Sequence, residues 1–139
     1  MTNPIEDDLA RAQLELKRAY LLLEAGEADL AAESAERAVS IAPDHPIPTI
    51  IRGAILCAMG NSRGALGALR AARKRWPSEA LAHVHFAEAC FFAGRDTRGV
   101  SALSDARSCP NSTAHAALID SMEGFWREAG RIDSQGDTT

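Results

Sequence analysis

Residues 53–77 read GAILCAMGNSRGALGALRAARKRWP, and this stretch decides the fold of the 139-residue chain. Two helical patterns meet at Gly60, and Pro77 ends the second of them. A glycine at such a junction suits a left-handed helix end, because it has no Cβ to clash with the backbone. The stretch therefore predicts a helical hairpin.

The hairpin pattern recurs about every 34 residues. The turn glycines are Gly26, Gly60 and Gly94. Small residues follow five and twelve positions later, at Ala31, Ala65 and Gly99 and at Ala38, Ala72 and Ala106. Prolines close the units at Pro43, Pro77 and, one residue early, Pro110. Small residues at fixed positions let two helices approach closely, so we expect three stacked hairpins.

These signals predict an all-α fold. We expect helices over about 4–25, 28–42, 47–59, 62–75, 79–93, 96–108 and 112–129. Asn3 is a candidate first N-cap, and Ser78 with Glu79 and Asn111 are candidate starts of two later helices. The predicted organisation is one domain over 1–129, with repeats at about 12–45, 46–79 and 80–110. A capping helix over 112–129 and a flexible tail over 130–139 follow.

Composition and charge exclude several classes of protein. Alanine makes up about one fifth of the chain, which favours helix. Three cysteines without a Cys-x-x-Cys pair fit neither a disulfide framework nor a zinc finger, and they fit a reducing cytoplasm. No secretory signal over Met1–Asp8 and no apolar run long enough for a membrane span is recognised. We therefore expect a cytoplasmic protein without a membrane partner.

The charges are unevenly distributed along the chain. Residues 1–44 carry ten acidic and four basic side chains, whereas residues 45–78 carry six basic side chains and no acidic one. The formal net charge of the whole chain is -4. One basic belt within an acidic protein lacks the broad positive face that nucleic-acid binding requires, so we expect no nucleic-acid partner.

A 34-residue helix–turn–helix unit with this spacing of glycine, alanine and proline resembles the tetratricopeptide repeat (TPR) family. The resemblance covers residues 12–110. It implies an all-α right-handed solenoid of three TPR hairpins plus a C-terminal capping helix. Leu118, Ile119, Met122 and Trp126 have near-helical spacing, which predicts the face that caps the last repeat. Where the family carries a large aromatic residue early in each first helix, this chain has Glu15, Thr49 and His83.

The first helices of such a stack line its concave inner face, and that face is predicted to be a peptide-binding groove. The residues that we expect to line the groove are mostly apolar: Leu16, Tyr20, Leu23, Ile47, Ile50, Ala54, Leu81, Val84, His85, Glu88 and Phe91. An open apolar surface of this kind calls for a partner with apolar anchors. The alternative is that curling of the stack, or dimerisation, buries it.

A second candidate site is the basic cluster Arg70, Arg73, Lys74 and Arg75, which would dock an acidic partner. The alternative is that these charges complement a helix dipole on a solvated face. A helix points His83 and His85 apart, so no metal site is predicted. The sequence contains no nucleophile–base motif and no phosphate loop, so we expect no enzyme activity and no cofactor.

Two stretches resemble more narrowly the class II chaperones of bacterial type III secretion: Gly53-Ala54 with Ala58-Met59-Gly60 and Ala65, and His85 with Ala87-Glu88 and Gly94. The resemblance implies that Ile50, Ala54, Val84, Glu88 and Phe91 line a groove holding an apolar segment of a secreted translocator. The chain is also similar to the small repeat chaperones that sequester needle subunits with a second small helical chaperone.

The predicted function is therefore non-catalytic protein binding. The leading hypothesis is a cytoplasmic chaperone that holds an apolar segment of a type III secreted subunit in the groove. The alternative hypothesis is a structural TPR scaffold or adaptor in a larger protein assembly.

Overall fold

A computed structural model describes residues 3–133, 135, 137 and 138. Its helices are α1 (Pro4–Glu24), α2 (Ala28–Ile41), α3 (Pro46–Ala58), α4 (Ser62–Arg75), α5 (Ala80–Phe92), α6 (Asp96–Arg107) and α7 (Ala116–Glu128), with a 3₁₀ turn, η1 (Ser112–His115), before α7. The described residues contain no strand beyond one isolated bridge between Ile132 and Thr138. The predicted all-α fold is confirmed.

The glycines at the hairpin turns end their helices as predicted. Gly26, Gly60 and Gly94 have φ values of 80°, 84° and 73°, the left-handed region that glycine tolerates best. After Gly60, the backbone N–H of Asn61 donates to the Leu56 carbonyl at 2.9 Å, as in a Schellman helix end. Gly130 repeats this arrangement after α7 with φ 69°, which the 34-residue spacing did not indicate.

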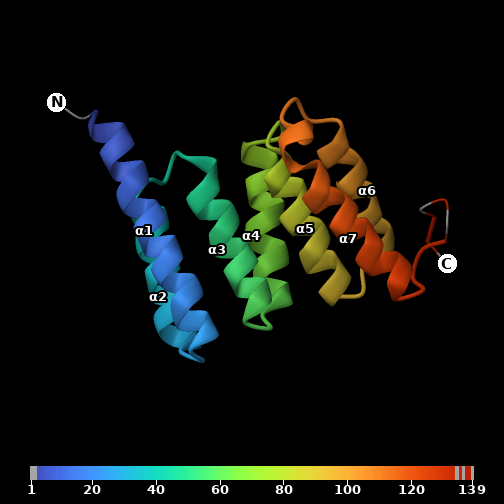
Figure 1. Ribbon diagram of the computed structural model, residues 1–139, viewed down its shortest axis with the longest axis horizontal. Helices are drawn as coiled ribbons and strands as arrows, with labels where there is room; N and C mark the ends of the chain where they lie inside the picture. Colours follow the sequence, from blue (N-terminus) through green and yellow to red (C-terminus); the bar gives the residue numbers. More distant parts are fainter. Residues whose placement is uncertain (1–2, 134, 136, 139) are drawn as a thin grey trace.

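The helices form one curved layer of hairpins (Figure 1). The first helices pack side by side, because α1 contacts α3, α3 contacts α5 and α5 contacts α7. Within the described residues, no Cα of α2 lies within 8 Å of α4, and none of α4 lies within 8 Å of α6. The first helices are therefore drawn together on the inner face and the second helices are spread apart on the outer face.

The core is divided unequally along the stack. Its largest hydrophobic cluster runs from α3 to α7 and includes Ile50, Val84 and Trp126. Two smaller clusters, centred on Leu16 and on Ala19, join α1 and α2 to α3. The first hairpin is thus attached through a separate and smaller apolar contact.

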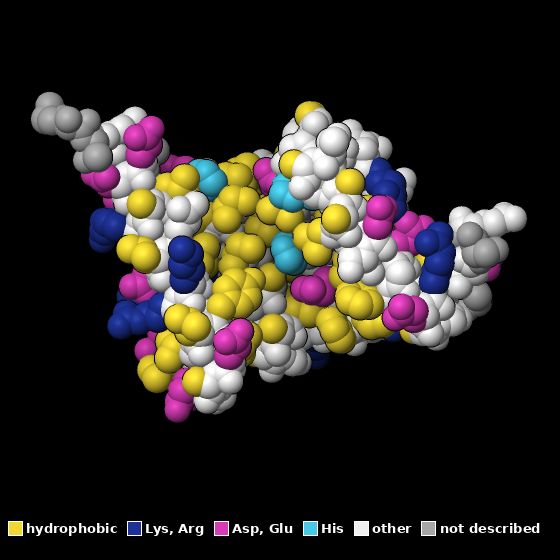
Figure 2. All heavy atoms as spheres, viewed as in Figure 1, with side chains coloured by type: hydrophobic (Ala, Val, Ile, Leu, Met, Phe, Trp, Pro, Cys, Tyr) yellow, Lys and Arg dark blue, Asp and Glu magenta, His cyan; other side chains and the backbone are white. Residues whose placement is uncertain are grey.

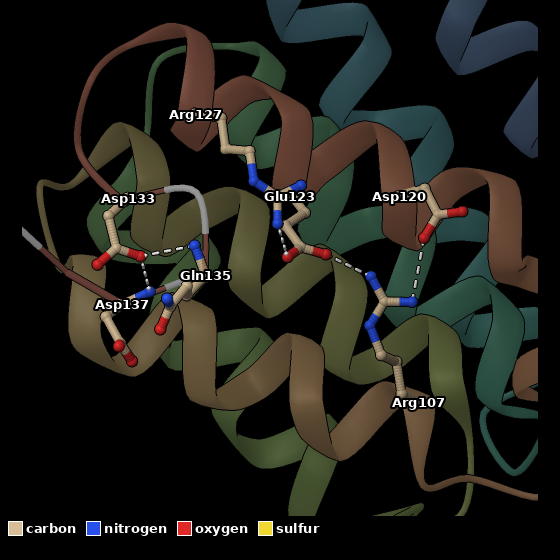
Figure 3. Close-up of polar contacts among 7 residues, drawn as sticks. All are labelled: Arg107, Asp120, Glu123, Arg127, Asp133, Gln135 and Asp137. Atoms are coloured by element: carbon tan, nitrogen blue, oxygen red, sulfur yellow. Dashed lines mark hydrogen bonds and ion pairs between the residues drawn. The ribbon is translucent and has the colours of Figure 1, made fainter.

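The seventh helix covers the last repeat with its apolar face. Ile119, Met122 and Trp126 are buried as predicted, whereas Leu118 is exposed because it lies on the solvent side of this face. Figure 3 shows how Arg107 of α6 reaches α7, where it donates to Asp120 at 3.0 Å and to Glu123. Arg127 also donates to Glu123, at 2.7 Å.

The start of the segment predicted as a flexible tail contacts the domain. Arg131 donates to the Phe91 carbonyl at 2.8 Å and to the Asp96 carboxylate, and Ile132 is buried. The Asp133 carboxylate accepts the backbone N–H groups of Gln135 and Asp137 (Figure 3). Residues 134, 136 and 139 of the predicted tail lie outside the described residues.

The junction before α7 differs from the single helix expected over 112–129. The chain first makes η1, and the Asn111 side chain caps α5 instead of its own helix. Its amide oxygen accepts the Ala80 N–H at 3.0 Å, and its amide nitrogen donates to Glu79 at 2.8 Å. No helix in the described part of the chain is long and apolar enough to cross a membrane.

Candidate functional site

The inner face of the stack, formed by α1, α3, α5 and α7, is the candidate site, and we call it the groove. Figure 2 shows this face, with hydrophobic side chains gathered in the hollow between α1 and α7. Basic side chains lie mostly at the rims in this view. The apolar character that the sequence predicted for the inner face is therefore present.

Four of the residues predicted to line the groove belong to the core instead. They are Leu16, Ile50, Ala54 and Val84, and all are buried. Neighbouring first helices close over these side chains, because α1, α3 and α5 are in direct contact. Ile50 and Val84 have almost no exposed surface and cannot contact a partner, so their assignment to the groove lining is corrected, whereas Leu16 and Ala54 each keep 6%. A charged substitution at Ile50 or Val84 would therefore test folding and not binding.

The other predicted residues keep some exposed surface. Tyr20 is 41% exposed. Those that are partly buried are Leu23, Ile47, Leu81, His85, Glu88 and Phe91. Of these residues, Glu88 lines a hollow of about 390 Å³, together with Cys57, Ala58, Gly60 and Phe92. It joins α3 and the turn after it to α5, in the middle of the stack.

Glu88 supplies the negative charge of this hollow. Burial raises the pKa of Tyr20, and the Glu88 carboxylate raises it further. The same two causes, in the same order, raise the pKa of the Cys57 thiol to about 11. Tyr20 of α1, Cys57 of α3 and Glu88 of α5 therefore share one electrostatic environment. Tyr20 and Glu88 are nevertheless 68 residues apart in the sequence.

His85 lies one helical turn before Glu88, as the i,i+3 spacing predicts. The distance from His85 Nδ1 to Glu88 Oε1 is 3.6 Å, longer than a hydrogen bond. His85 Nδ1 is buried and has no hydrogen-bond partner. The groove thus contains the Glu88 carboxylate and, one turn away on α5, an unsatisfied ring nitrogen of His85.

Aromatic side chains form the α7 side of the groove. The Phe91 ring packs edge-on against Phe92 and Trp126, with centroid distances of 5.4 Å and 5.3 Å, and lies 6.4 Å from the Phe125 ring. Phe92 is 66% exposed and Phe125 is 49% exposed. The sequence reasoning missed Phe125. Its spacing of seven residues from Leu118, which is two helical turns, could have indicated a second apolar stripe on α7.

The basic cluster of α4 does not form one surface. Arg75 donates to the Asp44 carboxylate at 2.7 Å and to the Pro43 carbonyl at 3.0 Å. Arg73 donates to Asp105 at 2.8 Å and to His83 Nδ1 at 2.9 Å. Both arginines are therefore engaged within the domain.

His83 has a structural role. Its Nδ1 accepts from Arg73, and its Nε2 lies 2.8 Å from the Pro77 carbonyl, which fits the neutral tautomer protonated on Nε2. His83 is buried and satisfied, whereas His85 faces the groove, so the two rings diverge as expected. No three His, Cys, Asp or Glu residues in the described ranges come together as a metal site.

The sequence matches no protein-family model and no curated protein. Among solved structures, the TPR domain of Sgt2 from Aspergillus fumigatus matches with a TM-score of 0.64 and 18% identity, over 86% of this chain and 82% of that chain. The fold is that of a TPR domain. This likeness confirms the fold class that the 34-residue repeat predicted.

A mutant O-GlcNAc transferase from Thermobaculum terrenum also matches, with a TM-score of 0.69 and 21% identity over 98% of this chain. The present chain spans only 25% of that transferase chain. At these identities the likeness concerns the backbone arrangement. The lining of the groove therefore has to be interpreted from this chain's own residues.

Proposed function

We propose that this TPR domain is a non-catalytic protein-binding module that holds an apolar segment of a partner protein in its groove. The observation that carries the proposal is a set of exposed aromatic side chains on the helices of the inner face: Tyr20, Phe92 and Phe125, of which Phe92 lines the hollow. They come from α1, α5 and α7, so a single ligand lying along the groove would contact all three helices.

The energetics favour binding through these side chains. Burying one large apolar side chain yields about 1.5–3 kcal/mol. Large aromatic anchors on a concave surface are typical of interface hot spots. The partner that complements them is an extended or helical segment with apolar side chains at regular spacing.

Glu88 adds a chemical requirement to the apolar segment. Its carboxylate is the one charged group in the lining of the hollow, and it is 31% exposed at the side chain. Covering this carboxylate without a partner would cost free energy. We therefore infer that the bound segment places a lysine, an arginine or another hydrogen-bond donor against Glu88.

Within this proposal, the finer role is that of a cytoplasmic chaperone for a type III secreted translocator or needle subunit. The resemblance of two sequence stretches to those chaperones supports it, and the apolar lining suits a client segment that must be shielded from water. The second candidate is a scaffold that holds stable partners in an assembly. The ion-paired outer face, with Arg73 and Arg75 engaged, favours a rigid scaffold equally well.

The groove is tested by substitutions of exposed residues. Phe92→Glu and Phe125→Glu, separately and together, are compared with the wild type in affinity capture from the native cell, read by mass spectrometry. Leu21→Glu is the matched control, because Leu21 of α1 is 67% exposed and does not line the hollow. We expect one or a few partners to be lost from the groove variants and retained with Leu21→Glu. Equal recovery by every variant would contradict the groove proposal.

The chaperone and scaffold roles differ in the state of the released partner. A chaperone client should aggregate when expressed alone and remain soluble when expressed with this domain. A scaffold partner should be folded and soluble in both cases. Thermal unfolding of each variant by circular dichroism shows whether the lost binding reflects a lost fold.

A further inference from the structure

A second site lies on the outer face, between the second helices of the last two repeats. Helices α4 and α6 both pack on α5, and no Cα of one lies within 8 Å of a Cα of the other. The gap between them is a furrow of about 360 Å³, lined by Arg70, Arg73, Phe86, Thr97, Arg98 and Ser101. We call it the outer furrow. It is separate from the groove, because α1, α3, α5 and α7 form the groove, whereas α4 and α6 form the walls of the outer furrow.

At one end of the outer furrow, the lining side chains bond to other residues of the domain. The Arg73 guanidinium lies 4.4 Å from the centre of the Phe86 ring and donates to Asp105 across the gap. The side chain of Phe86 is buried and forms the floor. Asp105 and Arg73 neutralise each other, so this end contributes a fixed wall and no net charge.

The remaining part of the outer furrow carries positive charge without a counter-charge. Arg70 of α4 and Arg98 of α6 are exposed, and neither forms an ion pair with any described residue. The Thr97 and Ser101 hydroxyls lie beside them in the lining. Both carboxylates of α6 are already bound, Asp96 by Arg131 and Asp105 by Arg73. Arginine charges on opposite walls are therefore available to an anion.

The electrostatics of Cys90 agree with this geometry. Burial raises the pKa of the Cys90 thiol, and four arginine charges oppose that rise. The four are Arg73, Arg98, Arg95 and Arg70. Arginines from both α4 and the α6 region thus converge on one part of the molecule, although the sequence separates Arg70 from Arg98 by 28 residues.

We propose that the outer furrow binds carboxylates of an acidic protein segment, with Arg70 and Arg98 as the residues that recognise them. The arginines lie on separate helices whose Cα atoms are more than 8 Å apart, which suits successive carboxylates along a chain. A single phosphate needs converging donors, and the α6 N-terminus does not supply them because Asp96 occupies its first turn. The proposal does not depend on the function proposed for the groove.

The test is binding of a fluorescein-labelled hexaglutamate peptide, followed by fluorescence anisotropy at physiological ionic strength. We expect Arg70→Gln with Arg98→Gln to weaken binding about tenfold, because the double substitution removes two exposed ion pairs with the peptide. The control pair is Lys17→Gln with Arg18→Gln, which removes the same charge from the exposed face of α1. We expect this control to bind like the wild type.

Each other outcome overturns the proposal. Absence of hexaglutamate binding to the wild type excludes the carboxylate site. Equal weakening by the two double variants would show that net charge, and not the outer furrow, attracts the peptide. Binding of a phosphoserine peptide in preference to hexaglutamate would assign the site to phosphate and overturn the carboxylate assignment. Phe92→Glu serves as a further control, because a groove substitution should leave hexaglutamate binding unchanged.

Discussion

Gly99 has no side chain because the indole of Trp126 occupies that space. A Cβ on Gly99 would lie 2.4 Å from two ring carbons of Trp126 and 3.0 Å from Cys90 Cβ. The residue is helical, so its role here concerns volume and not backbone conformation. Gly53 is similar, since a Cβ there would lie 2.6 Å from Leu69. The small positions of the repeat therefore mark close contacts between helices.

We predict that Gly99→Ala destabilises the domain by about 1–3 kcal/mol, because the Cβ forces the buried Trp126 ring to move. Gly124→Ala is the matched control. No atom lies within 4 Å of a Cβ at Gly124, so this helical substitution should stabilise the domain by about 0.5–1 kcal/mol. Urea unfolding followed by circular dichroism measures both. An unfolding midpoint for Gly99→Ala at or above that of the wild type would contradict the packing argument.

The sequence predicted which positions are small, but not what each small residue contacts. The spacing of Ala31, Ala65 and Gly99 identified a position that recurs in the repeat. The contact of Gly99 with Trp126 depends on how α7 lies against α6, and no periodic signal encodes that angle. Likewise, the 3.6-residue period identified inward-facing residues such as Ile50 and Val84. It could not show that neighbouring helices cover them, because burial depends on how strongly the stack curves.

At the scale of elements, Asp96 connects three parts of the chain. Its carboxylate accepts a hydrogen bond from Trp126 Nε1 at 3.0 Å and hydrogen bonds from the Arg131 guanidinium. Arg131 also lies 4.2 Å from the centre of the Phe91 ring. This single carboxylate at the start of α6 thereby holds α7 and the residues after it against α6, and Arg131 links them to α5.

The hydrogen bond from Arg131 holds the pKa of Asp96 below its usual range, and the hydrogen bond from Trp126 lowers it further. Together they outweigh burial, which raises the pKa. A lowered pKa in the folded state means that the carboxylate stabilises the fold at neutral pH. This contribution is lost as the pH falls below about 4 and through the folded-state pKa. Asp96→Asn should thus cost about 1–2 kcal/mol at neutral pH.

The measurement is the urea unfolding free energy of the wild type and of Asp96→Asn at a series of pH values. We expect the difference between them to shrink as the solution becomes acidic. Asp120→Asn is a suitable control, because the Asp120 side chain is 68% exposed and its ion pair with Arg107 lies at the surface, so its effect should be smaller at neutral pH. A difference for Asp96→Asn that is constant across the acidic range would refute the role assigned to this carboxylate.

For the whole molecule, the unequal division of the core predicts unequal local stability. Repeat domains unfold approximately as a sum of neighbouring contacts, so a weakly attached terminal repeat opens first. Here α1 and α2 are joined to the remainder through two small clusters, and the largest cluster begins at α3. The capping helix α7 protects the opposite end.

We therefore expect amide hydrogens of α1 and α2 to exchange through openings of lower free energy than those of α5. Native-state hydrogen exchange with mass spectrometry, at increasing urea below the unfolding transition, measures these free energies by segment. The expected order is the first hairpin, then α3 and α4, then α5 and α6. One common free energy for all segments would show a single cooperative unit and contradict the prediction.

The first helices of the hairpins contact one another and the second helices are spread apart, so the outer face of the layer deforms more easily than the inner face. Bending about the line of inner-face contacts changes the spacing of α2, α4 and α6 and leaves the contacts of α1, α3 and α5 largely in place. The inner face therefore acts as a hinge, and the spacing between the second helices on the outer face is free to change. Widening the outer furrow increases the curvature of the stack and narrows the groove. The stiffness of this small domain therefore depends on the contacts between α1, α3 and α5, and not on contacts between the second helices.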